Sequence, residues 1–71
     1  DSAERTAFAW SVAVGPALAR VTSVEIRNRN LIVSARDARW ARELERSRDT
    51  ILLRVQQLLG QDTIKGMYIN A

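Results

Sequence analysis

Two short runs of alternating side chains, separated by Asn-Arg-Asn, constrain the fold of this chain more than any other feature. Within each run, β-branched or other apolar side chains recur at every second position, a period that is typical of a half-buried β-strand. The positions that we expect to face a core are Thr22, Val24, Ile26, Leu31, Val33 and Ala35. Asparagine tolerates a positive φ better than most residues. The sequence therefore predicts a β-hairpin with its tip near Arg29.

Helical patterns precede the hairpin. Residues 2–14 have a broad helical periodicity, with Ser2 as the expected N-cap. The apolar residues that share one face of this helix are Phe8, Ala9 and Val12, with Trp10 and Val14 beside them. Gly15-Pro16 interrupts the pattern, and because proline is tolerated in a first helical turn, residues 16–20 are expected to form a second short helix behind a kink.

A longer helical pattern follows the hairpin, from an N-cap at Asp37 to a stop at Gly60. Its apolar positions are Trp40 and Leu44 in the first half and Ile51, Leu52, Val55, Leu58 and Leu59 in the second. Residues 46–49 contain no apolar side chain, so the pattern fits either one bent helix or two abutting helices with Ser47 as a cap. Residues 62–70 are predicted to form a third strand, in which Gly66 indicates a bulge or the close approach of another backbone.

The predicted order is α-β-β-α(-α)-β, which is an α+β fold. A three-stranded antiparallel sheet with the helices packed on one face is the simplest arrangement of these elements. The 71 residues suffice for one domain, residues 1–71. Because the chain begins at Asp1 instead of methionine, we expect it to be a piece of a longer protein.

Several classes of function are disfavoured by the composition. The chain has no cysteine and no histidine, which excludes thiol catalysis and Cys-type zinc sites and removes the usual general base. Glu43 and Glu45 lie two residues apart on a helix and face different directions, so they form no carboxylate pair. There is also no glycine-rich phosphate loop. We therefore expect no enzyme, no metal, no cofactor and no small-molecule substrate. No apolar run approaches the length of about 20 residues that spans a bilayer, so no membrane contact is expected.

Arginine dominates the positive charge: the formal net charge is +3, and ten of the eleven basic residues are arginine. A GC-rich genome and the recognition of phosphate both explain this bias. On the helix after Asp37, Arg39, Arg42 and Arg46 fall within about 60° of one another, opposite Trp40 and Leu44. Either this stripe binds nucleic acid, or it is a solvated face with the local pairs Arg39–Glu43 and Arg42–Glu45.

Three more arginines cluster at the hairpin: Arg27, Arg29 and Arg36. Arg27 and Arg36 should point away from the core, and Arg29 lies at the exposed tip. They are candidates for nucleic-acid contacts, or else charges that prevent the pairing of sheet edges.

Exposed apolar residues are the candidates for a protein partner. Alternation places Ile32 and Tyr68 on the outer face of the sheet, and Leu53 lies outside the apolar stripe of its helix. Isolated exposed apolar residues are also normal on protein surfaces. Trp10 and Trp40 are expected to pack in the core.

Four segments together are distinctive: W-S-V-A-V-G-P-A-L-A at residues 10–19, L-I-V at 31–33, A-R-W-A-R-E-L at 38–44 and L-L-R-V-Q-Q-L-L-G at 52–60. On these segments the chain resembles the DciA family of bacterial replicative-helicase loaders. The resemblance implies a KH-like fold and a cytoplasmic, nucleoid-associated protein. It also implies a non-enzymatic role in DNA replication, in which the domain binds the replicative hexameric helicase and single-stranded or forked DNA.

A KH domain clamps nucleotides with a GXXG loop, but the corresponding residues 45–49 contain no glycine. We therefore expect any nucleic-acid contact to depend on arginine and to tolerate different base sequences. An RNA-binding KH-like module and a domain that binds only proteins remain as alternatives.

Overall fold

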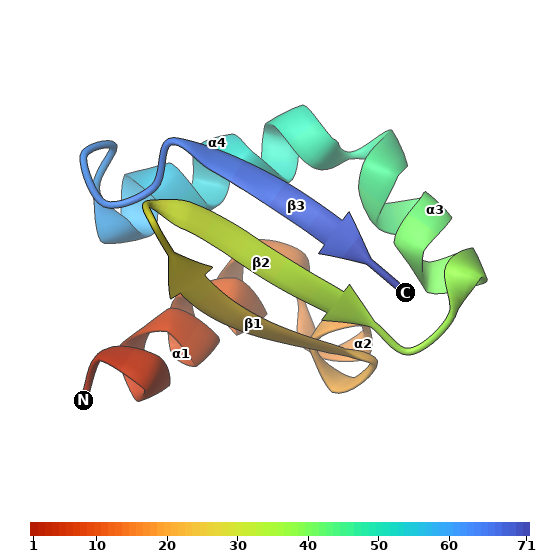
Figure 1. The fold of residues 1–71 in the computed structure, drawn as a ribbon. Helices are drawn as coiled ribbons and strands as arrows, with labels where there is room; N and C mark the ends of the chain where they lie inside the picture. The colour runs from red at the N-terminus through yellow and green to blue at the C-terminus, as the bar shows by residue number, and fades with distance from the viewer.

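The computed structural model describes all residues, 1–71, as four helices and a three-stranded sheet (Figure 1). In chain order the elements are α1 (Ser2–Val14), α2 (Pro16–Arg20), β1 (Thr22–Arg27), β2 (Asn30–Ala35), α3 (Ala38–Arg46), α4 (Arg48–Leu59) and β3 (Gly66–Asn70). The predicted α+β class and element order are confirmed.

The hairpin forms as the alternation predicts. β1 and β2 pair antiparallel, with Val24 opposite Val33. Asn28 and Arg29 make the tip, with φ of 51° and 64°. Two successive residues at positive φ match the right-handed twist of the two strands, so the short tip fixes the register that turns Leu31 and Val33 into the core.

The third strand corrects the prediction of an all-antiparallel sheet. β3 lies beside β2 and runs parallel to it, with Leu31 opposite Met67, so the sheet is mixed (Figure 1). Parallel neighbours require a connection of a dozen or more residues across one face of the sheet, and α3 and α4 lie in that connection. β3 is also shorter than predicted, because residues 61–63 form a turn. What approaches Gly66 closely is a side chain and not a backbone, since a Cβ there would lie 3.0 Å from Asn30 Oδ1.

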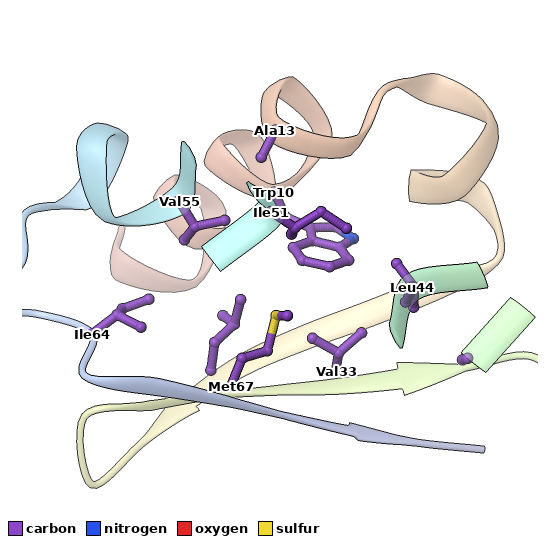
Figure 2. Packing of buried hydrophobic residues seen from close by; sticks show 10 residues of the cluster. Trp10, Ala13, Val33, Leu44, Ile51, Val55, Ile64 and Met67 are labelled. Carbon is purple, nitrogen blue, oxygen red and sulfur yellow. The ribbon is translucent and has the colours of Figure 1, made fainter. Parts of the chain in front are cut away.

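The helices cover one face of the sheet and enclose the hydrophobic core (Figure 2). The buried residues of this core are Trp10, Ala13, Leu31, Val33, Ala35, Leu44, Ile51, Val55, Ile64 and Met67. The Trp10 indole N–H donates a hydrogen bond to Thr22 Oγ1 at 2.7 Å, and the Thr22 hydroxyl donates to the Leu18 carbonyl at 2.7 Å. This relay ties α1 to the junction of α2 and β1. Trp40, by contrast, packs against the core and stays only partly buried.

The helix ends show which capping predictions hold. Asp37 caps α3 by accepting from the Trp40 N–H at 3.1 Å, as predicted. Gly60 ends α4 with φ of 99°. The N-cap of α1 is Asp1 and not Ser2, because the Asp1 carboxylate accepts from the Glu4 N–H at 2.9 Å. The long helical pattern is two helices separated at Ser47, whose side chain makes no capping bond.

The buried face of α1 also differs from the prediction. Phe8 and Val12 are 70% and 54% exposed, while Ala9 and Ala13 are buried. α4 packs against α1, and the Arg54 guanidinium donates to the Ala13 backbone carbonyl at 3.2 Å. The neighbouring Trp10 fills the space between α1 and the sheet (Figure 2). Phe8 and Val12 lie on another side of the helix and remain exposed to solvent.

Candidate nucleic-acid and partner surfaces

The six candidate arginines are all exposed, but the fold divides them into two groups. Arg27 and Arg29 lie at the hairpin tip, where β2 begins. The other four follow the opposite end of β2: Arg36, Arg39, Arg42 and Arg46. The six residues of β2 separate the groups by about 20 Å, at about 3.3 Å per residue.

At the hairpin tip, both arginines have partners within the chain. Arg27 forms an ion pair with Glu25. The Arg29 Nε–H donates to the Asp62 carbonyl at 2.9 Å, and the Arg29 carbonyl accepts from the Lys65 N–H at 2.7 Å. These bonds attach the tip to the loop before β3, so Arg29 has a structural role there.

The arginines after β2 are freer. Neither predicted pair, Arg39–Glu43 or Arg42–Glu45, forms; Glu43 pairs instead with Arg46 at 3.1 Å. The Arg39 guanidinium lies over the Trp40 ring, 5.7 Å from its centre. Arg36, Arg39 and Arg42 take part in no ion pair.

The junction between α3 and α4 is neutralised internally. Arg48 binds both oxygens of Glu45, at 2.7 and 3.0 Å, and also donates to the Met67 carbonyl of β3. The hydrogen bond from Arg48 lowers the pKa of the Glu45 carboxyl below its ordinary value, and the same bond raises the pKa of Arg48. The sequence interpretation compared this segment with the GXXG loop of a KH domain. In the structure, Arg48 instead links α3, through Glu45, to the edge strand β3.

Arg20 is a basic residue of this region that the sequence interpretation missed. It ends α2, and it lines the same two surface hollows as Arg36. The predicted hairpin register would have indicated that Arg20 lies near Arg36. Because Thr22 pairs with Ala35, the residues just before Thr22 must lie near Arg36.

Apolar side chains are exposed on both sides of the molecule. Ile32 and Tyr68 are partners in the register of β2 and β3 and lie on the outer face of the sheet, as predicted. Tyr68 is 59% exposed. Leu53 is 49% exposed on α4, on the helical side, so it forms no single surface with the other two. Sequence analysis missed Phe8 and Val12, which lie one turn apart on α1, because it assigned them to the face shared with Ala9.

The family model for Dna[CI] antecedent, DciA, matches residues 2–69. The chain belongs to the DciA family. The resemblance seen in the Trp10 and Trp40 segments is thereby confirmed. No curated protein matches the sequence.

DciA membership implies a role associated with helicase loading, in a family that is not catalytic. It suggests the replicative helicase as a partner and places the protein in DNA replication. No helix of this DciA-family domain is long and apolar enough to cross a bilayer.

Proposed function

We propose that this DciA-family domain binds single-stranded or forked DNA and the replicative hexameric helicase together, and assists helicase loading without catalysing a reaction. The observation that carries the proposal is the set of exposed arginines without carboxylate partners after β2, Arg36, Arg39 and Arg42. They occur in a chain whose family has a role associated with helicase loading.

Phosphate contacts explain how these residues would bind DNA. Guanidinium is permanently charged and binds a phosphate through two parallel hydrogen bonds. Binding releases counterions and requires no particular base sequence. Arg27 and Arg46 contribute more weakly in this proposal, because each already pairs with a glutamate. Exposed pairs of this kind contribute at most about 1 kcal/mol, so a phosphate can replace the glutamate.

For the helicase, we assign the surface of α1 that contains Phe8 and Val12. Large apolar side chains that are more than half exposed and lie one turn apart are typical of protein contacts. Ile32 and Tyr68 form the alternative surface, on the outer face of the sheet, and Leu53 is a further candidate on α4.

DNA binding is tested by fluorescence anisotropy with a labelled single-stranded oligo-dT between 50 and 200 mM salt. Each phosphate contact contributes about 0.7 to the slope of log K against log salt on a single strand. Arg36→Ala combined with Arg42→Ala should lower the slope by about 1.4, twice that value. Arg5→Ala, which removes the same charge from the exposed start of α1, should leave it unchanged. Absence of DNA binding by the wild-type domain at 50 mM salt contradicts the proposal, and a preference for oligo-U supports an RNA-binding module instead.

Helicase binding is tested separately, by titrating the purified helicase from the same organism with nuclease-treated domain. Phe8→Ser should weaken the complex at least tenfold, and Tyr68→Ser, a matched loss of an exposed aromatic ring, should have little effect. If Tyr68→Ser weakens the complex and Phe8→Ser does not, the helicase binds the outer face of the sheet. Unchanged affinity in both variants removes both apolar surfaces from the proposal.

A further inference from the structure

We propose that the corner between α2 and the open end of the hairpin is the site that holds the nucleic-acid backbone, with Arg20 and Arg36 gripping a phosphate. This inference rests on the proposed function and adds to it a defined site and a residue, Arg20, that lies outside the arginine stripe of α3.

A hollow of about 380 Å³ lies at this corner. Its lining residues are Arg20, Val21, Thr22, Ser23, Ser34, Ala35 and Arg36. A second hollow, of about 530 Å³, shares both arginines and also touches Trp40. Neither hollow is lined by an acidic residue. The nearest carboxylate in the chain, that of Asp37, is occupied as the cap of α3, where it accepts from the Trp40 N–H at 3.1 Å.

The hydrogen bonds in the corner leave most donors available. Arg20 uses its Nε–H on the Pro16 carbonyl at 3.3 Å, and a guanidinium has five N–H donors. The Arg36 side chain makes no hydrogen bond, but its backbone N–H donates to the Val21 carbonyl at 2.8 Å, which fixes the residue beside α2. Ser23 and Ser34 are partners in the register of β1 and β2 and are exposed. Serine hydroxyls commonly bind phosphate oxygens in protein–DNA contacts.

The α3–α4 junction is the competing site, because that is where a KH domain holds the backbone. A hollow of about 370 Å³ lies there, lined by Glu45, Arg46, Ser47, Arg48, Asp49 and Thr50. Its two arginines already pair with Glu43 and Glu45, and Asp49 adds a further negative charge. A phosphate would have to displace these partners and approach the remaining carboxylates. The distribution of charge therefore favours phosphate binding at the corner of Arg20 and Arg36 over binding at the α3–α4 junction.

The aromatic neighbour favours a nucleic acid over a free phosphate. Trp40 lines the second hollow, and Arg39 lies over its ring. Proteins that bind single strands combine cationic contacts to the backbone with stacking of bases on aromatic rings and on guanidinium planes. A strand whose phosphate lies between Arg20 and Arg36 would have an adjacent base beside this stacked pair.

The test compares Arg20→Gln, Arg36→Gln and the double variant with Arg5→Gln, using oligo-dT and anisotropy. Because both arginines hold the same phosphate, the double variant should lower the salt slope by about 0.7, so that the ratio of affinities at 50 and 200 mM salt falls about 2.6-fold (4 to the power 0.7). Each single variant should lower the slope by less than this, because the other arginine still contacts the phosphate. Arg36→Lys should restore the slope, and Arg5→Gln should not change it. In ¹⁵N spectra, the Nε–H signals of Arg20 and Arg36 should shift saturably with oligo-dT. Inorganic phosphate at the same phosphate concentration should shift them much less.

The outcomes separate this inference from the proposed function. If the double variant keeps the wild-type slope while Arg42→Gln lowers it, the corner is not the site, although the domain still binds DNA. If a change at Arg48 lowers the slope and the corner variants do not, the backbone lies at the α3–α4 junction. If the wild-type domain binds no DNA, both are wrong. Because Arg36 makes no side-chain bond within the domain, its variants test the site even if Arg20→Gln destabilises α2.

Discussion

The relay from Trp10 through Thr22 to Leu18 gives a sharp prediction for the stability of the fold. Thr22→Val keeps the shape of the side chain but removes the hydroxyl that accepts from the indole N–H at 2.7 Å. Trp10 is 2% exposed, so its indole N–H has little access to a water that would replace that partner. A buried donor without a partner costs about 1–3 kcal/mol. Thr22→Val also removes the hydroxyl's bond to the Leu18 carbonyl, but this adds little to the cost, because that carbonyl still accepts from the Val21 N–H at 3.2 Å.

A loss of about 2 kcal/mol should lower the melting temperature by about 8–16 °C, because a domain of this size loses about 4–8 °C per kcal/mol. The assay is urea unfolding followed by circular dichroism, with a thermal melt of the same samples. Thr22→Ser is the matched control, since it keeps the hydroxyl and removes only a methyl group. We expect Thr22→Ser to cost less than about 1 kcal/mol. If Thr22→Val is as stable as Thr22→Ser, the relay does not hold α1 to the hairpin and the reasoning is refuted.

Three further variants test the capping and electrostatic interpretation. Asp37→Ala should cost about 1 kcal/mol in urea unfolding, because the Trp40 N–H loses its cap; equal stability of Asp37→Ala and Asp37→Ser would contradict this. Gly60→Ala should cost about 1–2 kcal/mol, because φ at this position is 99°, and an unchanged unfolding midpoint would contradict that reason. The lowered pKa of Glu45 means that its bond to Arg48 stabilises the fold above the unfolded-state pKa, and this contribution is lost as the pH falls through the lowered folded-state pKa. Unfolding measured across acid pH should therefore show the wild type losing its advantage over Glu45→Gln, and parallel curves would contradict the assignment.

Local patterns predicted most of the fold. The alternation in residues 22–35 specified which side chains of β2 are buried, and Asp37 and Gly60 marked helix ends correctly. The direction of β3 could not be obtained this way, since period two is the same in parallel and antiparallel strands. The long helical connection before β3 was the available signal.

The exposed face of α1 escaped prediction for a different physical reason. Phe8, Ala9 and Val12 share a broad helical stripe, and periodicity alone does not say which part of it the neighbouring helix covers. In the structure Ala9 and Ala13 are buried, and Phe8 is left 70% exposed.

The candidate site was predictable as a set of arginines but not as an arrangement. Projection on a helix grouped Arg39, Arg42 and Arg46, yet it paired Glu43 and Glu45 with the wrong arginines. In the structure both glutamates pair with the arginine three residues later in the chain. The Glu45–Arg48 pair spans the break between α3 and α4 at Ser47, and Arg48 also reaches β3. Because Glu43 pairs with Arg46 and Glu45 pairs with Arg48, Arg42 has no carboxylate partner, and the arginines at the α3–α4 junction are neutralised.

Co-elution of the purified domain with the replicative helicase of its own organism, with and without a forked DNA, tests the central claim most directly. The account predicts a complex of domain and helicase after nuclease treatment, and a larger complex when the fork is added. The larger complex should be lost in the Arg36→Ala and Arg42→Ala double variant, while the binary complex with helicase persists. A domain that elutes apart from the helicase whenever nucleic acid is removed would contradict the account.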